Sequence, residues 1–350
     1  MREAAGQEVV VITSSIYEKA KAIFGEYGSQ LRWEICPDAE GEVARMVAAS
    51  RARIAALGAA NYRGGAIYPA LQANARGAGA LVARFGVGYD GIDLVQCRER
   101  GIRVTITPGM LNQSVAEHTM ALLLALVRNI PALEHRLRGG SFEHQTGVEL
   151  SGRTLGVAGF GGIGRAVARI ASVGFGMRVL AFDAVPIAAQ LGRDGRTEGE
   201  FLAAYGLAEY STEFAAIAPR VDVLSVHMPV LQETRGYFDA RRLGMLRPGA
   251  LLVNTSRGAL VDERALFDAL ASGALGGAAL DVFSSEPYAP VDPQHDLRTL
   301  ANTVLTPHVA SDTVEANERM ARRVVRNIQA FREGRANDLD LVPELRGPAA

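Results

Sequence analysis

The chain has little cysteine, almost no net charge and no long apolar run, and each shortage excludes a class of protein. Cys36 and Cys97 are the only cysteines among 350 residues, and neither lies in a CxxC or Cys/His spacing that could hold zinc. Lys and Arg number 37 against 38 Asp and Glu, which argues against nucleic-acid binding through a broad basic face. The longest apolar run, residues 120–127, is far below the roughly twenty residues that cross a bilayer. We therefore expect no metal site, no nucleic-acid partner and no membrane span.

The start of the chain, MREAAGQEVVVIT, passes directly into a strand-like run and lacks the pattern of a secretory signal. Together with the lack of a disulfide framework, this predicts a cytoplasmic protein. Apolar residues make up 48% of the chain and charged residues 21%, enough to build folded cores. The length favours two domains. The chain contains 38 glycines, more than the usual share of about 7%, and this excess calls for a structural explanation.

Short β-branched or leucine-rich runs alternate with helical patterns along almost the whole sequence. This alternation predicts an α/β fold with parallel strands and right-handed crossovers. The first series of expected strands covers residues 9–13, 31–35, 53–57, 80–86 and 102–106, with helices at 18–27 and 39–51. The second series covers residues 154–160, 178–183, 221–227, 250–256, 277–283 and 303–308, and a helix with an apolar stripe is expected at 312–332.

Three further segments have distinct patterns. Residues 114–128 predict a helix that is apolar nearly all round, with Ser114 as N-cap and Glu117 completing a capping box. Such a helix must be covered on several sides, by two domains or by a partner subunit. Residues 184–210, which contain several glycines, and residues 284–302, which contain three prolines, are predicted to be loops.

The sharpest local signal is a G-x-G-x-x-G motif at residues 159–164. It follows a predicted strand and opens a predicted helix, as a dinucleotide-binding loop requires. Gly159 permits the tight turn, Gly161 lets the backbone approach a pyrophosphate, and Gly164 lets the helix pack on the strand. The helix N-terminus would offer amides and a positive dipole to the phosphates.

An acidic residue stands where this motif needs one. Asp183 ends the next strand, 24 residues after Gly159, and the expected separation is about 20. A carboxylate there accepts hydrogen bonds from both ribose hydroxyls of an adenosine and would repel a 2′-phosphate. The sequence therefore predicts NAD as the cofactor in preference to NADP.

Polar clusters follow the later strands of the second series, and in open α/β sheets ligands bind at this end of the strands. Reducing a carbonyl by hydride transfer requires a proton donor and a cation that holds the substrate. His308 suits the first role because histidine titrates near neutrality, and Glu286 would favour its charged form. Arg257 suits the second role because a guanidinium grips a carboxylate in two places. Without further context, Arg257 could be a surface turn residue, Glu286 a loop charge and His308 structural.

Six stretches in order resemble the D-isomer-specific 2-hydroxyacid dehydrogenase family: ARFGVGYDGIDL (83–94), TPGMLNQSVAEHT (107–119), GVAGFGGIGRAVA (156–168), LLVNTSRGALVDERAL (251–266), GAALDVFSSEP (277–287) and LTPHVASDT (305–313). The resemblance implies that His308 is the acid/base, Glu286 its partner, and Arg257 the group that binds the carboxylate of a 2-oxoacid or D-2-hydroxyacid. It implies two doubly wound parallel-sheet domains, one flavodoxin-like and one dinucleotide-binding, with a cleft between them. Residues 1–110 plus 306–350 would form the substrate domain, residues 111–305 the NAD-binding domain, and the protein would be a homodimer.

The resemblance also implies a set of contact residues. The substrate carboxylate would meet the backbone at Val87 and Gly88 as well as Arg257. The cofactor would contact the glycine loop, the ends of the following strands and the catalytic histidine: Val87, Gly159, Gly161, Gly162, Ile163, Gly164, Asp183, His227, Met228, Thr255, Ser256, Arg257, Asp281 and His308.

The sequence departs from the family in two connections and leaves two questions open. An insertion is expected around residues 192–207, and the connection from Glu286 to His308 is slightly long. Arg63, on the loop where relatives contact the substrate side chain, is either a specificity residue or a solvated charge. The alternative function is that of an NAD(H)-sensing corepressor, which shares the fold and the Arg-Glu-His set. Formate chemistry is disfavoured because the formate enzymes carry Gln where this chain has Glu286.

Overall fold

The computed structural model describes residues 7–346, which form two compact units. Unit 1 comprises the chain up to Leu111 and again from Asp312, and unit 2 comprises Asn112–Ser311. The second boundary therefore lies after residues 306–311, which the sequence analysis assigned to the first domain. The His308 segment belongs to unit 2 because its backbone is hydrogen-bonded to the end of a unit 2 strand.

Unit 1 is a five-stranded parallel sheet with strand order β2-β1-β3-β4-β5. This is the flavodoxin-like order. The inner strands β3 and β4 are buried at every position, as near-continuous apolar runs covered on both faces should be. The strands are β1 (Glu8–Thr13), β2 (Leu31–Cys36), β3 (Ile54–Leu57), β4 (Ala80–Arg84) and β5 (Ile102–Thr105). The helices are α1 (Ser14–Lys19), α2 (Lys21–Glu26), α3 (Glu40–Ser50), α4 (Ile67–Ala75), α5 (Leu94–Glu99) and α14 (Val314–Arg332).

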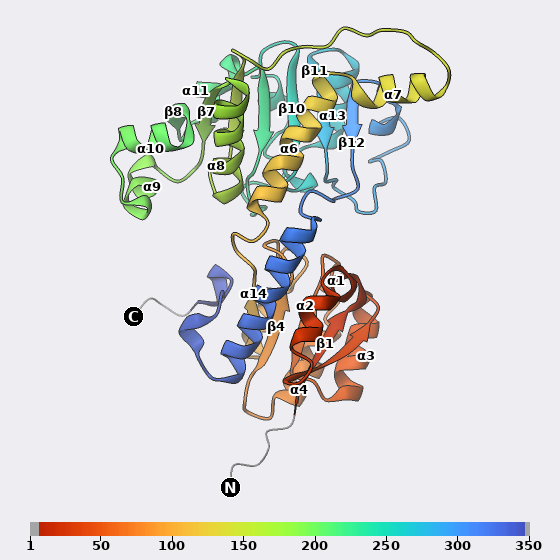
Figure 1. Cartoon of the computed structure of the whole chain (residues 1–350), viewed down its shortest axis with the longest axis vertical. Helices are drawn as coiled ribbons and strands as arrows, with labels where there is room; N and C mark the ends of the chain where they lie inside the picture. The colour runs from red at the N-terminus through yellow and green to blue at the C-terminus, as the bar shows by residue number, and fades with distance from the viewer. Residues whose placement is uncertain (1–6, 347–350) are drawn as a thin grey trace. The chain divides into compact units, whose positions relative to one another are not determined.

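The chain returns to unit 1 through α14, which packs against β4 and α2 (Figure 1). Its apolar stripe, expected from the sequence, is buried along its full length: Ala316, Met320, Val324, Ile328 and Phe331. Thr313 caps the helix by accepting a hydrogen bond from the amide of Ala316 at 3.1 Å. The segments at both ends of the described chain are thus joined in one folded unit.

Unit 2 is a seven-stranded parallel sheet with strand order β12-β11-β10-β9-β6-β7-β8. The order reverses between β6 and β9, which defines the switch point where a doubly wound sheet binds its ligand. The strands are β6 (Thr154–Ala158), β7 (Arg178–Phe182), β8 (Leu207–Ser211), β9 (Val223–Val226), β10 (Ala250–Asn254), β11 (Leu275–Leu280) and β12 (Thr303–Leu305). The helices are α6 (Asn112–Val127), α7 (Ile130–Arg138), α8 (Gly162–Arg169), α9 (Ile187–Asp194), α10 (Glu198–Tyr205), α11 (Phe214–Ile217), α12 (Ala240–Leu243) and α13 (Glu263–Ala271). Two doubly wound parallel sheets confirm the predicted fold class.

Helix α6 begins two residues earlier than expected, so the assignment of Ser114 as N-cap was wrong. Ser114 is buried within the first turn, and the carboxylate of Glu117 accepts a hydrogen bond from the side chain of Gln113 at 2.7 Å. The capping-box spacing occurs here inside a helix because Asn112 and Gln113 already have helical backbone. Within unit 2, α6 packs on α8 and on strands β10, β11 and β12 (Figure 1). These contacts cover most of its apolar surface.

Residues 184–210 are not a loop, as the glycines suggested, but contain α9, α10 and the start of edge strand β8. Gly195 and Gly206 have φ angles of +63° and +66° and end the two helices, while Gly192 and Gly199 lie inside them. Thr197 and Glu200 form the capping box that starts α10. Glycine marked helix ends here because only glycine enters the left-handed region at little cost. The other predicted loop, residues 284–302, contains only one short 3₁₀ turn.

The inserted helices are held to the glycine-loop helix by Arg165 of α8. Its guanidinium donates to both carboxylate oxygens of Asp194 at 2.8 and 2.9 Å and to Gln190 at 2.7 Å. It also lies 4.9 Å from the ring centroid of Tyr205 and 5.7 Å from that of Phe160. The insertion is therefore a folded part of unit 2.

We predict that Arg165→Leu lowers the free energy of unfolding of the protein by about 2–4 kcal/mol, since the only cation it leaves to the mostly buried Asp194 carboxylate is the more exposed Arg196, at the longer distance of 3.3 Å. Urea denaturation measures the change. Arg169→Leu, at an exposed position one turn along the same helical segment, is the matched control and should shift stability by no more than about 0.5 kcal/mol. Equal unfolding midpoints for the two variants would show that Arg165 does not hold the insertion.

Candidate active site

The glycine loop connects β6 to α8 with close backbone packing on one side and open space on the other. A Cβ at Gly159 would lie 2.5 Å from the carbonyl oxygen of His227, and a Cβ at Gly164 would clash with the carbonyl oxygen of Gly159. By contrast, a Cβ at Gly161 meets nothing within 4 Å. No side chain caps the first turn of α8, so its amides face that open space. This cradle fits a pyrophosphate group.

Asn112 contributes to the same loop and was missed from the sequence. A Cβ at Gly162 would clash with its side-chain amide, so the first residue of α6 packs directly on the glycine loop. Asn112 and Gly162 are 50 positions apart in the sequence. The only sequence signal of their contact was Gly162 itself, a glycine next to Gly161 that the motif does not require. Ile163, the neighbouring predicted contact, packs against the core of unit 2.

Asp183 lies at the carboxyl end of β7 and points at the glycine loop. One carboxylate oxygen accepts the amide of Phe160 at 2.6 Å, and the other accepts the amide of Val185 at 2.8 Å. The half-buried carboxylate is therefore fixed beside the loop, where the ribose of a dinucleotide would lie. The residue fits the role that its position in the sequence predicts.

His227 and Met228 follow β9 on the opposite side of the glycine loop. Burial lowers the pKa of His227 to about 3, so its imidazole is neutral at physiological pH. The ring nitrogen Nε2 lies 2.7 Å from the hydroxyl of Ser225. The carbonyl of Met228 accepts a hydrogen bond from the hydroxyl of Ser256 at 2.6 Å, which ties the ends of β9 and β10 together.

Arg257 follows β10 in a tightly packed turn, which the lack of a side chain at Gly258 allows. A Cβ at Gly258 would overlap the backbone of Phe283 and Ser284, so the Arg257 turn lies flush against the segment that carries Glu286. The Arg257 guanidinium donates to the carbonyl of Ser256 at 2.7 Å. The side chain of Asn254 holds the turn by donating to the Arg257 carbonyl at 2.8 Å.

Glu286 and His308 form a hydrogen-bonded pair. The Nδ1 atom of His308 lies 2.7 Å from one oxygen of Glu286, and the amide of Phe283 donates to the other at 3.1 Å. Burial alone would raise the pKa of Glu286, but the hydrogen bond and charge of His308, the Phe283 amide and the charge of Arg257 together hold it below its usual value. The three residues predicted for catalysis therefore gather at one place in unit 2, with Glu286 ionised.

Asp281, predicted as a cofactor contact, binds the His308 segment. It is fully buried, and its carboxylate accepts the hydroxyl of Thr306 at 2.6 Å and the amides of Val309 and Ala310 at 2.9 and 2.8 Å. Its own carbonyl accepts the amide of His308 at 2.8 Å. These contacts support the left-handed backbone of His308, whose φ is +55°, a conformation costly for a non-glycine residue.

Thr255, another predicted cofactor contact, is buried at the end of β10. Its hydroxyl lies 2.8 Å from that of Thr119 on α6, and Thr119 also donates to the carbonyl of Val115 at 2.7 Å. From the sequence alone, this helix is expected only to be an apolar element. Adjacent polar residues within its apolar pattern were the signal that one side of α6 contacts the carboxyl ends of the strands.

Val87, Gly88 and Arg63 lie in unit 1, on the loops after β4 and β3. Arg84, which is buried and was not singled out from the sequence, donates to the carbonyl of Gly88 at 2.6 Å and to that of Leu57 at 3.2 Å. The two loops are joined where the amide of Tyr62 donates to the carbonyl of Gly91 at 2.8 Å. The structure thus places Arg63, which is exposed, beside the Val87 segment.

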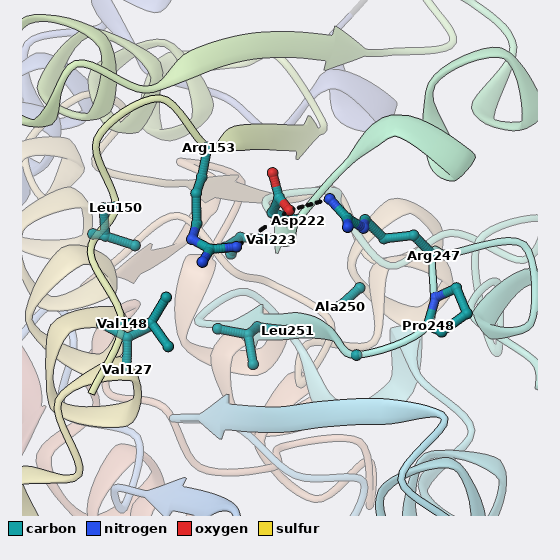
Figure 2. A pocket seen from close by; sticks show the side chains of 11 residues that line it. Val127, Val148, Leu150, Arg153, Asp222, Val223, Arg247, Pro248, Ala250 and Leu251 are labelled. Atoms are coloured by element: carbon teal, nitrogen blue, oxygen red, sulfur yellow. Dashed lines mark hydrogen bonds and ion pairs between the residues drawn. The ribbon is translucent and has the colours of Figure 1, made fainter. Parts of the chain in front are cut away.

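A surface pocket lies at the opposite edge of the unit 2 sheet. Its charged lining residues are Arg153, Asp222 and Arg247, and both arginines contact the Asp222 carboxylate (Figure 2). These residues stand at the amino ends of β6, β9 and β10, whereas the residues described above follow the carboxyl ends. The hollow therefore does not belong to the candidate active site.

Within residues 7–346, no helix is both long enough and apolar enough to span a membrane. Over the same residues, no group of three or more His, Cys, Asp or Glu side chains is arranged to hold a metal ion.

Residues 120–310 match the family model described as "D-isomer specific 2-hydroxyacid dehydrogenase, NAD binding domain". The chain is 38% identical over 263 residues to a glyoxylate reductase from Thermococcus litoralis, covering 73% of this chain and 74% of the relative. It is 36% identical over 251 residues to a hydroxypyruvate reductase from Thermotoga maritima, covering 71% and 76%.

Solved structures extend the similarity over nearly the whole chain. An NADPH-dependent glyoxylate/hydroxypyruvate reductase from Sinorhizobium meliloti, crystallised with NADP and malonate, has a TM-score of 0.78 at 29% identity and covers 99% of this chain and 100% of its own. A D-lactate dehydrogenase from Aquifex aeolicus, crystallised with NAD and lactic acid, has a TM-score of 0.78 at 28% identity and covers 97% and 100%.

The lowered pKa of Glu286 predicts how Glu286→Gln changes stability with pH. A carboxyl group whose pKa is lowered on folding stabilises the native state above its ordinary pKa, and this contribution is lost as the pH falls through the lowered native value. The wild type should therefore melt at a higher temperature than Glu286→Gln near pH 7, and the gap should narrow as the pH falls below about 4. Thermal melts across this range test it, with Glu143→Gln at an exposed position as control. A gap that is constant with pH would contradict the assignment.

Proposed function

The chain belongs to the D-isomer-specific 2-hydroxyacid dehydrogenase family, and from this membership we propose that it interconverts a small 2-oxoacid and its D-2-hydroxyacid with NAD as cofactor. The observation that carries the proposal is the His308–Glu286 hydrogen bond beside Arg257 in unit 2. It brings a proton donor, the anion that supports its charged form and a carboxylate-binding cation to one place. The names of the glyoxylate and hydroxypyruvate reductases support a 2-oxoacid as the substrate class.

In this mechanism, the residues of unit 2 orient the substrate and move one proton. Arg257 binds the substrate carboxylate in a bidentate pair, which presents the carbonyl to the reaction centre. The bound dinucleotide supplies the hydride for reduction and accepts it in the reverse direction. His308 donates its proton to the carbonyl oxygen as that oxygen becomes a hydroxyl, and takes the proton back during oxidation. Glu286 holds Nδ1 of His308, so that Nε2 is left to face the substrate.

The residues that would hold the dinucleotide are those whose geometry fits it. Gly161 and the first turn of α8 would receive the pyrophosphate, and Asp183 the adenosine ribose. The ends of β9 and β10, with Met228 and Thr255, would line the same region. We propose that Val87 and Gly88 add backbone amides for the substrate carboxylate, held in place by Arg84.

The proposal that the protein is a homodimer is supported by apolar side chains that unit 2 leaves exposed. Ile130 and Leu137 on α7 are 53% and 60% exposed, and Phe142 in the following segment is 81% exposed. Exposed large apolar side chains that gather in one region mark interaction sites.

We predict that the purified protein oxidises NADH in the presence of glyoxylate, pyruvate, hydroxypyruvate or 2-oxoglutarate, and that His308→Asn lowers kcat by about 10²- to 10⁴-fold. Binding of NADH, measured by fluorescence, should remain within a few-fold of wild type because the glycine loop is untouched. His144→Asn, at an exposed position, is the control and should keep full activity. Tight NADH binding with no turnover on any 2-oxoacid would overturn the proposal and favour an NAD(H)-sensing protein.

Cofactor preference gives a second prediction. The wild type should have a higher kcat/KM for NADH than for NADPH, because the fixed carboxylate of Asp183 repels a 2′-phosphate. Asp183→Ser should reduce the NADH-to-NADPH ratio by about tenfold or more. Asp183→Asn keeps the size of the side chain and removes its charge, so it distinguishes charge repulsion of the 2′-phosphate from an effect of side-chain size. A wild type that uses NADPH as well as NADH would refute the preference, and one of the solved relatives is NADPH-dependent.

A further inference from the structure

His118 is a polar residue in the middle of the apolar helix α6, and the proposed mechanism does not use it. Its side chain is 24% exposed and extends toward the end of β11. The ring nitrogen Nε2 lies 3.2 Å from the hydroxyl oxygen of Thr306 and 3.5 Å from a carboxylate oxygen of Asp281. Both partners belong to the hydrogen-bonded group that holds the His308 segment.

The hydrogen-bond geometry determines the direction of these contacts. Thr306 has one hydroxyl hydrogen, and it is donated to the Asp281 carboxylate at 2.6 Å. The Thr306 oxygen can then only accept a hydrogen bond from His118, and the ionised carboxylate can also only accept. Nε2 of His118 must therefore carry a hydrogen, in either the neutral or the charged ring.

This donor completes the environment of a fully buried charge. Asp281 is inaccessible to solvent, and although burial would raise its pKa, hydrogen bonds from His118, Thr306 and the amides of Val309 and Ala310 hold it below its usual value. A buried carboxylate with fewer donors either takes up a proton or draws other donors toward itself. Either change would loosen the contacts that support the left-handed backbone at His308.

We propose that His118 is a positioning residue for the catalytic His308. It acts through Thr306 and Asp281 by donating a hydrogen bond that keeps Asp281 ionised and the Thr306–Ala310 contacts in place. The role rests on the proposed dehydrogenase function, since its consequence is the placement of the imidazole that transfers the proton. Helix α6 suits this role because it also packs on α8 and on strands β10, β11 and β12.

The kinetic test compares three variants. His118→Leu removes the donor and should lower kcat by about 10- to 100-fold, the range seen when an outer hydrogen-bond partner of a site residue is lost, while the Kd for NADH changes less than about threefold. His118→Gln, whose amide nitrogen can replace Nε2 as a donor, should recover most of that loss. Glu117→Leu, an exposed position on the same helix, is the control for introducing leucine and should keep kcat within about twofold.

A double variant tests the route through Thr306. Because both side chains donate to the Asp281 carboxylate and contact each other, the loss in the double variant His118→Leu/Thr306→Val should differ from the product of the two single losses, whereas independent effects would multiply. A wild-type rate for His118→Leu, an equal loss in the Leu and Gln variants, or multiplying effects in the double variant would each overturn the proposal. Thermal melts show whether a loss of rate in His118→Leu reflects a loss of folding. His118→Gln, which keeps the hydrogen-bond donor, then distinguishes loss of the donor from loss of folding.

A spectroscopic measurement tests the role of His118 independently of enzyme turnover. In protein labelled with ¹⁵N-histidine, the His118 signal, assigned by its absence in His118→Gln, should show a hydrogen on Nε2 throughout the pH range of the native state. In His118→Leu, the ring signals of His308 should shift. An unprotonated Nε2 on His118 would overturn the positioning role even in a protein with no detectable turnover, whereas a protonated Nε2 in an inactive protein would reject only the proposed reaction.

Discussion

The buried carboxylate of Asp281 is the constraint on which the geometry of the site depends. A charge at the end of β11 with no access to solvent must be met by donors from the protein, and three of these donors are the Thr306 hydroxyl and the amides of Val309 and Ala310. The carbonyl of the same residue binds the amide of His308. The donors that this buried anion requires therefore attach the segment bearing His308, the proposed acid/base, to the sheet, in a backbone conformation that His308 would not otherwise favour.

Close backbone packing places the remaining groups around this point. Gly258 allows the Arg257 turn to lie against the backbone of Phe283 and Ser284, and Glu286 follows directly in that second segment. Gly159 and Gly164 do the same for the glycine loop, which meets the carbonyl of His227. In each case a single added methyl group would overlap backbone atoms that cannot move independently of a strand. Gly164 and Gly258 are therefore required by close backbone contacts, Gly195 by left-handed backbone at a helix end, and Gly159, whose φ is +92°, by both.

The sequence predicted what is local and periodic, and it failed where a role depends on distant partners. Both strand series, apart from edge strand β8, and the parallel fold follow from alternating apolar runs, and the proposed Arg257, Glu286 and His308 group follows from polar residues at strand ends. The helices α9 and α10 were missed because glycine at a helix end and glycine in a loop look alike without the Arg165 contacts that hold the helices. Ser114 matched a capping pattern, yet the helix had already begun. The hydrogen bonds of Asp281 could not be inferred, because its donors lie 25 or more residues away along the chain.

The distribution of roles between the two units explains why chemistry is easier to infer than the substrate. Arg257, Glu286 and His308 all belong to unit 2, where the buried Asp281, the glycine packing and helix α6 restrict each of them to one arrangement. Arg63 lies on an exposed loop of unit 1, whose hydrogen bonds to the Val87 segment are made by backbone atoms such as the amide of Tyr62. On this loop Tyr62 is fully buried, whereas Arg63 is exposed, so packing does not restrict the Arg63 side chain. An exposed loop residue such as Arg63 can therefore differ without disturbing the fold, whereas the residues proposed for catalysis lie in a packed, hydrogen-bonded arrangement, and only the second kind leaves a pattern that a single sequence reveals.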